Sequence, residues 1–309
     1  MHDPLESIKP QVRGLRRYSL RYETVRVKLN QNENPWDIPI EIRNETLRRL
    51  QHRAWSRYPE FEPSTLIERL SEFNGWAADG ILVGNGSNEL IQALLMVTVG
   101  EGKRVLINEP TFSLYRQITT VLGGEIISVP LSSQLAYDMK AIKAATELQK
   151  PDVTIICSPN NPTGCTILQT DLAEILEISR GLVAVDEAYF EFAGETALEL
   201  LKQHQNLVVL RTFSKALGMA ALRVGYLLTS PALAREISKA LLPYNLNLFS
   251  RTAAEVALEM YEARLKTLVQ IILGERERLC EELGRIPGLE PVRSQANFMI
   301  VRSAVEPRR

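Results

Sequence analysis

The sequence lacks several features that would indicate a membrane, nucleic-acid or metal-binding protein. It has no apolar run near the roughly 20 residues of a membrane-spanning helix, and no apolar signal-peptide core at its start. Its formal net charge of -1 argues against general attraction to nucleic acid or anionic membranes. The three cysteines show no pairing or metal-ligand spacing, and the three histidines are scattered. We expect no metal site and a reduced cytoplasmic setting.

What the sequence does contain is a regular alternation of apolar strands and helices. At 309 residues and 45% hydrophobic content, the chain can bury a large core and divide into two domains. The alternation over residues 79–228 predicts an α/β fold, a mostly parallel central sheet with helices on both faces. A long amphipathic helix over 251–283, bent near Gly274, and a strand within 296–302 predict a small α+β domain. We expect residues 1–36 to form an N-terminal arm and part of the small domain, residues 37–245 a large domain, and residues 246–309 the rest of the small domain.

A lysine follows one of the predicted buried strands. Lys215 comes just after the apolar run 207–210, with the hydroxyls of Thr212 and Ser214 before it and Arg223 after it. Strand ends carry the chemistry in many α/β proteins. A lysine that attacks a carbonyl must be neutral, and a neighbouring cation or partial burial lowers its pKa toward that form. The alternative is a solvated turn.

A glycine-rich turn links an earlier predicted strand to a helix. Gly84 and Gly86 precede Ser87 and Asn88, either of which can cap the helix that follows. The glycines allow the backbone to approach an anion at the helix N-terminus. A tight turn with positive φ explains the same glycines equally well.

Polar or aromatic residues also follow three other predicted strands. Phe112 is either a ring that stacks on a planar cofactor or a core residue. Asn161 lies in a loop stiffened by prolines. Asp186, near Tyr189, follows four apolar residues, so its carboxylate either needs a cationic partner or caps a helix. Because the ends of parallel strands share one edge of a sheet, we expect all of these side chains to converge.

Taken together, these side chains suit pyridoxal phosphate. Lys215 would bind the aldehyde, Asp186 the pyridinium nitrogen, and Asn161 with Tyr189 the ring hydroxyl. Phe112 would cover the ring. The phosphate would be held by the helix N-terminus and by three side chains, Arg223, Thr212 and Ser214.

Six short motifs carry a resemblance to a known family. They are Asn30-Gln-Asn-Glu-Asn-Pro35, Arg57-Tyr-Pro59, Gly84-Asn-Gly-Ser-Asn-Glu89, Asn160-Asn-Pro-Thr-Gly164, Asp186-Glu-Ala-Tyr189 and Ser214-Lys215 with Arg223. From about Arg13 to Arg302 the chain resembles the fold-type I, class I/II aminotransferases, and within them most closely those acting on histidinol phosphate. The resemblance implies that pyridoxal phosphate is bound covalently by Lys215. It also implies a homodimer with shared sites.

The resemblance further assigns residues outside the strand ends. It implies that Tyr58 reaches the cofactor phosphate of the partner subunit, and that Tyr18 and Asn34 contact the substrate. Asn88 stands where the family commonly has aspartate, a change that preserves a role for its backbone amide. The implied reaction moves the amino group between histidinol phosphate and 2-oxoglutarate, with Lys215 as general base and then acid. Threonine-phosphate decarboxylase and an aromatic amino-acid aminotransferase are the alternative activities.

The end of the chain departs from the family pattern. Family members usually continue past the strand that resembles residues 296–302, into a segment with an arginine that binds the substrate carboxylate. Arg302, Arg308 and Arg309 do not match that motif. We expect a shortened small domain, with one strand at 298–301 and an incomplete carboxylate site. A catalytically impaired homologue is therefore a further alternative.

Overall fold

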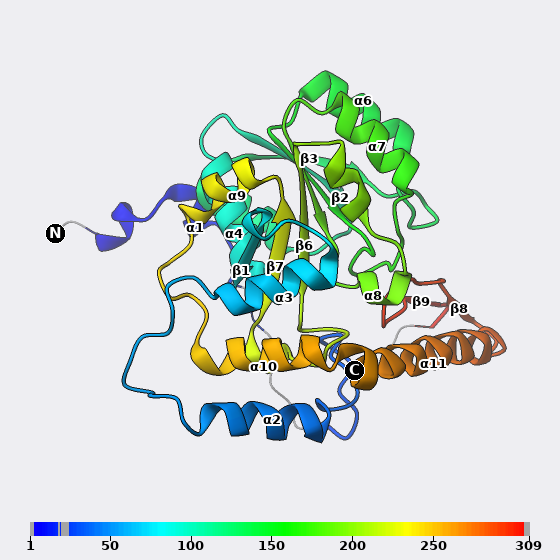
Figure 1. Ribbon diagram of the computed structural model, residues 1–309. Coiled ribbons are helices and arrows are strands. Elements are labelled where there is room, and N and C mark those ends of the chain that lie inside the picture. The colour runs from blue at the N-terminus through cyan, green and yellow to red at the C-terminus, as the bar shows by residue number, and fades with distance from the viewer. Residues whose placement is uncertain (1–2, 18, 20–24, 306–309) are drawn as a thin grey trace.

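The computed structural model describes residues 3–17, 19 and 25–305, and has a seven-stranded sheet at its centre (Figure 1). Helices cover both faces of this sheet, which confirms the predicted α/β fold. The strand order is β1-β7-β6-β5-β4-β2-β3. The strands are β1 Ile81–Gly84, β2 Arg104–Glu109, β3 Glu125–Pro130, β4 Val153–Cys157, β5 Leu182–Asp186, β6 Leu207–Thr212 and β7 Gly225–Thr229.

Strand direction decides which loops meet at one edge of the sheet. Strands β2 to β6 pair in parallel, whereas β7 is antiparallel to both of its neighbours, β6 and β1. Only β7 therefore runs the opposite way. The carboxyl ends of the other six strands and the beginning of β7 share one edge.

The central strands are continuous apolar runs because helices cover them on both sides. In β5, Val183 and Val185 belong to one hydrophobic cluster, whereas Ala184 belongs to the cluster on the opposite face. All three side chains are almost completely buried. This double burial explains why the strands lack the alternation of apolar and polar residues typical of an exposed sheet.

The helices form one layer on each face of the sheet, and one further helix, α2, lies outside these layers (Figure 1). On one face, α4 packs against α5 and α9, and on the other α6 packs against α7 and α3 against α10. Helix α2 lies alongside α10 (Figure 1). Their bounds are α2 Ile40–Leu50, α3 Ser64–Asn74, α4 Ser87–Thr98, α5 Leu114–Leu122, α6 Met139–Gln149, α7 Gln169–Ile178, α8 Phe190–Ala193, α9 Pro231–Ser238, α10 Leu248–Glu259 and α11 Lys266–Gly284.

The long helix predicted over 251–283 is interrupted, but not where the sequence suggested. The interruption is a π-helical turn at Tyr261–Leu265, and α11 runs without a break through Gly274. A Cβ at Gly274 would meet open space, so this glycine only lowers the local helix propensity. The π-helical turn instead directs Leu265 into the core, where it is 1% exposed, and places the ring of Tyr261 against Phe73.

The prediction of a single, unpaired strand at 298–301 was wrong both in the position of the strand and in its lack of a partner. The strand is β9 Val301–Ser303, and it pairs antiparallel with β8 Leu289–Pro291. Pairing satisfies backbone groups that a lone strand would leave open. Phe298 lies outside the strand because its ring packs against Tyr189 in the large sheet's loop region, with ring centroids 5.1 Å apart.

The N-terminal described residues lie to one side of the sheet (Figure 1). The first described residues include a short 3-10 helix, Pro4–Ser7, and α1 Pro10–Arg13, neither of which has a buried residue. The apolar core on the α3 side includes Ala254 and Leu265, which lie beyond the expected domain boundary at 245 and 246. The division into an arm and two domains stays a prediction.

No helix in the described part of the chain is long and apolar enough to cross a membrane.

Candidate functional site

The shared edge of the sheet brings the predicted strand-end residues together. Backbone pairing sets Cys157 beside Asp186, Thr212 beside Gly225, and Gly225 beside Gly84. Because β7 runs the opposite way, its beginning and the preceding Arg223 lie at the same edge as the ends of β1 and β6. The reversed strand thus lets Arg223 approach the glycine-rich turn after β1.

Lys215 lies three residues beyond β6, in a partly buried position. Its Nζ donates a hydrogen bond to the Gln31 backbone oxygen at 2.7 Å and lies 5.6 Å from the centre of the Tyr189 ring. Burial lowers the pKa of Lys215 to about 8, with Arg223 lowering it further and Glu33 opposing the shift. The neutral amine is therefore accessible near neutral pH, as a nucleophile or proton acceptor requires.

Asp186 ends β5 as a carboxylate that is only 3% exposed. The Tyr115 hydroxyl donates to its Oδ2 at 2.6 Å, and the Ala188 backbone N–H donates to its Oδ1 at 3.1 Å. Burial raises the pKa of Asp186, while these two hydrogen bonds lower it. Among the described residues, no ion pair involves Asp186. A buried carboxylate of this kind is stabilised by a cation, and a protonated pyridine nitrogen meets that need.

Arg223 and the N-terminus of α4 form a second part of the site. Arg223 has a left-handed backbone (φ 53°), and its Nη1 donates to Ser214 Oγ at 3.2 Å. Gly86 has a φ of 82°, and a Cβ there would overlap the Arg223 guanidinium. The glycine thus allows the arginine to lie against the start of the helix. The positive end of a helix dipole beside a guanidinium is a typical phosphate site.

The cap of α4 corrects one prediction. Gly86 is the N-cap residue, and no side-chain hydrogen bond from the described residues caps the helix, so neither Ser87 nor Asn88 has the predicted capping role. The nearby carboxylate of Glu89 instead accepts the Asn85 backbone N–H at 2.6 Å. Close packing explains the difference, because a Cβ at Gly225 would overlap the Ser87 backbone nitrogen.

Two further hydroxyls lie beside this helix start. Thr212 is 5% exposed and Ser214 7% exposed. Thr212 Oγ1 accepts the Ser214 backbone N–H at 3.1 Å and donates to the Val224 oxygen at 3.3 Å. Guanidinium, hydroxyl and helix N-terminus together provide the donor set that a phosphate ester needs.

Tyr189 and Asn161 come together as predicted from the sequence. The Asn161 side-chain amide donates to the Tyr189 hydroxyl at 3.4 Å, and Asn32 donates to the same oxygen at 3.2 Å. Burial raises the pKa of Tyr189, so its hydroxyl keeps its proton. This cluster lies within reach of Lys215 and provides neutral donors for a ring oxygen. The residues at the sheet edge therefore fit pyridoxal phosphate in both charge and donor type.

Phe112 lies between the end of β2 and the start of α5. Its ring packs edge-on against Tyr115, with centroids 5.6 Å apart and planes at 86°. Tyr115 itself was given no role from the sequence. The only signal for it was the spacing of two aromatic residues three positions apart, which places them on one side of a helical turn.

The three residues expected from the resemblance alone have different positions. Asn34 lies beside the lysine segment, where its amide donates to the Ala216 oxygen at 3.2 Å and its Oδ1 accepts the Trp36 N–H. Tyr58 is 81% exposed and stacks on Tyr244, in a loop that projects from the molecule. Tyr18 lies outside the described residues.

Two segments distant in sequence complete the rim of the site. Residues 31–34 contribute the contacts of Gln31 with Lys215 and of Asn32 with Tyr189. From the C-terminal side, Asn297 donates to the Asn32 oxygen at 3.1 Å. Phe298 packs its ring against Tyr189. Sequence reasoning missed these contacts, because nothing local indicates which distant loops meet.

In the described part of the chain, no three His, Cys, Asp or Glu side chains lie close enough together to hold a metal ion.

Comparison with known proteins gives a consistent result. Residues 24–305 match the family Aminotransferase class I and II. The histidinol-phosphate aminotransferase of Chlorobaculum parvum is 39% identical over 277 residues, which is 89% of this chain and 78% of the relative. That of Chlorobium phaeobacteroides is 37% identical over 302 residues, covering 97% and 84% of the two chains.

Solved structures show the same fold. The histidinol-phosphate aminotransferase of Sinorhizobium meliloti, solved with pyridoxal-5'-phosphate, superposes with a TM-score of 0.88 at 22% identity, covering 97% of this chain and 83% of the other. The enzyme from Clostridium acetobutylicum gives a TM-score of 0.79 at 26% identity, covering 88% and 81%.

Proposed function

Because the chain belongs to the class I and II aminotransferases, we propose that it transfers an amino group from histidinol phosphate to 2-oxoglutarate, giving imidazole-acetol phosphate and glutamate. The observation that carries this choice of substrate is the set of relatives named histidinol-phosphate aminotransferase, up to 39% identical over most of the chain. The cofactor is pyridoxal 5'-phosphate. When bound, it supplies an electron sink for the electrons released at the substrate carbon.

In this proposal, Lys215 is the residue that binds the cofactor and moves the proton. Its pKa of about 8 gives a useful fraction of neutral amine near neutral pH, so it would accept the proton from the substrate carbon as a general base and then deliver it, as a general acid, to carbon C4′ of the cofactor. The centre of the Tyr189 ring lies 5.6 Å from Nζ, so the amine is close to the residues that would bind the ring oxygen. Asp186 would hold the positive charge on the ring nitrogen, and Tyr189 and Asn161 would bind the ring oxygen.

The remaining cofactor contacts are assigned by charge and position. Arg223 would pair with the phosphate, because its guanidinium lies beside Gly86 at the start of α4. Phe112 would cover one face of the ring. The other proposed phosphate donors are the hydroxyls of Thr212 and Ser214 and the backbone amides of Ser87 and Asn88.

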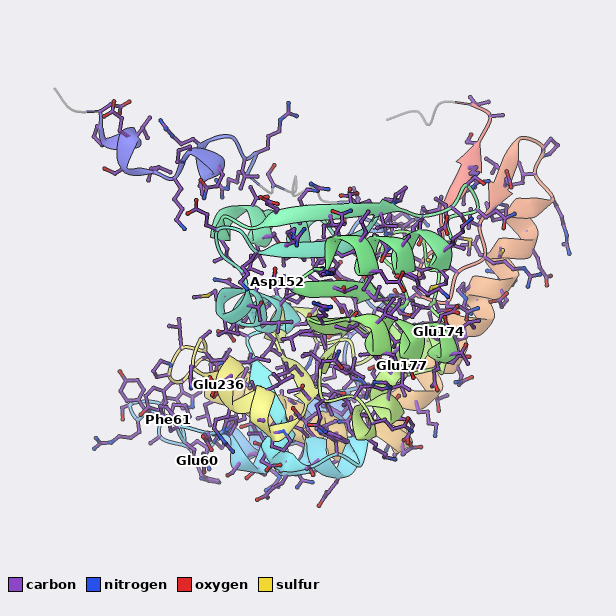
Figure 2. All side chains as sticks on the ribbon, turned by 90° about the horizontal axis from the view of Figure 1, so that it is seen from above. Glu60, Phe61, Asp152, Glu174, Glu177 and Glu236 are labelled. Atoms are coloured by element: carbon purple, nitrogen blue, oxygen red, sulfur yellow. The ribbon has the colours of Figure 1, made fainter. Side chains whose placement is uncertain are left out.

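A second copy of the chain would complete the site. Three aromatic residues on the loop between α2 and α3 are largely exposed, Trp55 at 83%, Tyr58 at 81% and Phe61 at 65%. Figure 2 shows Phe61 and its neighbour Glu60 at the outer edge of the molecule. Clustered exposed aromatic residues typically mark an interaction surface. We propose a homodimer in which Tyr58 contacts the cofactor phosphate of the partner subunit.

We also propose two residues that contact the substrate and a cellular setting for the protein. Tyr18 and Asn34 would lie near the substrate, and the segment of Asn34 already contacts the lysine loop through Ala216. The three cysteines carry free thiols, which fits the reduced cytoplasmic setting expected from the sequence.

The test of the reaction is glutamate formation by the purified chain. The chain is loaded with pyridoxal phosphate and supplied with 2-oxoglutarate and, in turn, histidinol phosphate, phenylalanine or threonine phosphate. We expect the highest kcat/KM with histidinol phosphate. Preference for phenylalanine, or release of carbon dioxide from threonine phosphate without glutamate formation, would overturn the proposed substrate.

The shared site has its own test, based on mixing two defective variants. Tyr58→Ala and Lys215→Ala are each expected to be impaired as homodimers. If Tyr58 acts across the interface, a mixed dimer has one site with both native residues, so mixing and subunit exchange should restore activity. Activity that stays at the level of the separate variants contradicts the shared arrangement.

A further inference from the structure

We propose that Tyr115 is a positioning residue, which keeps the Asp186 carboxylate ionised and aimed at the ring nitrogen of the cofactor. The inference rests on the aminotransferase site described above, but not on the choice of amino substrate.

The geometry around Asp186 gives each of its oxygens one donor from the chain. The Tyr115 hydroxyl donates to Oδ2 at 2.6 Å, and the Ala188 backbone N–H donates to Oδ1 at 3.1 Å. The backbone donor is adjacent in sequence and follows from the turn after β5. The tyrosine comes from α5, 71 residues away, and is the only side-chain donor to Asp186 among the described residues.

Tyr115 is held rigidly enough to fix the carboxylate. Its side chain is 0% exposed and belongs to the hydrophobic cluster that includes Ile107 and Cys157 of the neighbouring strands. Phe112 packs against its ring. A hydroxyl on such a side chain loses little conformational freedom when it makes a hydrogen bond, because packing has already fixed the ring.

The hydroxyl remains a donor throughout the working pH range. Burial raises the pKa of Tyr115 well above its ordinary value, so the group does not ionise near neutral pH. Burial likewise raises the pKa of the Cys157 thiol beside it. Among nearby charged side chains, Glu187 raises the pKa of Asp186 and Lys215 lowers it.

Ionisation of Asp186 therefore depends on a balance between burial and hydrogen bonds. Burial raises the pKa of Asp186, and the Tyr115 hydrogen bond is the largest opposing influence. A hydrogen bond to a charged group is stronger than one between neutral groups. Loss of the Tyr115 hydroxyl should raise the pKa of the carboxyl further, and so neutralise it at pH values where the native carboxylate is charged.

Tyr115→Phe isolates this effect, because it keeps the ring and its packing against Phe112. Tyr137→Phe is the matched control. Tyr137 is another tyrosine with a buried hydroxyl, and it donates to the backbone oxygen of Cys157 at the end of β4, not to Asp186. Both variants lose one buried hydroxyl near the same sheet edge, but only Tyr115→Phe removes a donor from the carboxylate.

The experiment measures cofactor affinity of the apo chain by equilibrium dialysis at several pH values, without amino substrate. Two ligands are compared, pyridoxal phosphate and its carbocyclic analogue with CH in place of the ring nitrogen. For Tyr115→Phe we expect about tenfold weaker binding of pyridoxal phosphate at neutral pH. The loss of affinity at low pH should move upward by about one pH unit. Binding of the carbocyclic analogue, and both profiles of Tyr137→Phe, should match the native chain.

Several outcomes would overturn the inference. Equal weakening toward both ligands, or the same pH displacement in Tyr137→Phe, would mean that the Tyr115 hydroxyl only supports the fold. A pH displacement that persists when Tyr115→Phe is combined with Asp186→Asn would show that it acts on another group. If the native chain binds pyridoxal phosphate as expected but does not use histidinol phosphate, the substrate proposal fails while this inference stands.

Discussion

Two adjacent carboxylates at the end of β5 have opposite surroundings. Asp186 and Glu187 are both buried, at 3% and 2% exposed, but they contact different side chains, Tyr115 and Arg211 respectively. Glu187 pairs with Arg211 at 2.9 Å and also accepts hydrogen bonds from Thr196 and the Ala197 N–H. Among the described residues, the hydrogen-bond donors to Asp186 are all neutral. A buried charge that the fold itself neutralises has its counterion in the protein, and loss of that counterion destabilises the fold, whereas a buried charge left without a counterion is available for a ligand.

The partner of Glu187 shows how complete this neutralisation is. Arg211 is 3% exposed, donates to Thr196 and Asn74 as well, and lies 3.6 Å from the centre of the Phe190 ring. All of these groups come from the chain. Similar burial thus accompanies two different roles, and the difference lies in whether the opposite charge is part of the protein.

The largest expected effect comes from replacing Lys215, which lies in the same site as Asp186. Lys215→Ala removes both the covalent attachment and the proton carrier, so turnover should fall by about 10⁴-fold or more. Steady-state kinetics with histidinol phosphate and 2-oxoglutarate measure this loss. A borohydride-stable bond between cofactor and the variant chain would show that another lysine is the attachment point.

Asp186→Asn should separate activity from stability. The amide keeps a hydrogen-bond acceptor for Tyr115 but cannot hold a positive charge on the ring nitrogen, so kcat/KM should fall by about 10²- to 10³-fold. The apo chain should unfold at the same or a higher denaturant concentration than native, because a buried charge has been removed. Native kinetics would contradict the assigned role.

Glu187→Ala should produce the reverse pattern. It leaves Arg211 buried without its counterion, which typically costs about 3–5 kcal/mol of unfolding free energy. Urea denaturation of the apo chain measures this loss, and the folded fraction should keep most of its kcat. Adding Arg211→Met should recover part of the stability. If the double variant is as unstable as Glu187→Ala, the unpaired charge is not the cause.

The smallest expected effect is on the pKa of Lys215, which should respond to replacement of Asp186 but not of Glu187. Acetylation of Lys215 in the apo chain, followed by mass spectrometry, should rise with a midpoint of about 8, well below the ordinary lysine value of 10.5. The negative charge of Asp186 raises the pKa of Lys215, so Asp186→Asn should move the midpoint to lower pH. Glu187→Gln should leave it unchanged. An equal shift in both variants would remove the electrostatic distinction between them.

The lowered pKa of Lys215 also makes the folding stability of the apo chain depend on pH, and the direction of that dependence follows from the shift. Because the folded-state pKa of Lys215 is lowered, the folded apo chain binds fewer protons at this lysine than the unfolded chain between about pH 8 and 10.5. The contribution of this residue to stability is therefore fully present above 10.5 and is lost as the pH falls through about 8.

The sequence by itself determined the layered fold and the residues at the sheet edge. Apolar runs separated by helices require a parallel sheet covered on both faces, and the carboxyl ends of its strands must then share one edge. That reasoning was enough to bring Asp186, Asn161 and Lys215 to one region. The family was indicated separately, by the resemblance of short sequence motifs around these residues, because such motifs are local and can be read without the fold.

Only the tertiary structure decided which distant groups complete the site. The contacts of Tyr115 with Asp186 and of Gln31 with Lys215 join residues 71 and 184 positions apart, and Phe298 reaches Tyr189 from the C-terminal region. Such contacts depend on how loops from separate elements pack, which no local period or motif encodes. The break in the long helix fell at Tyr261 and not at Gly274 for the same reason, since core packing outweighed local propensity.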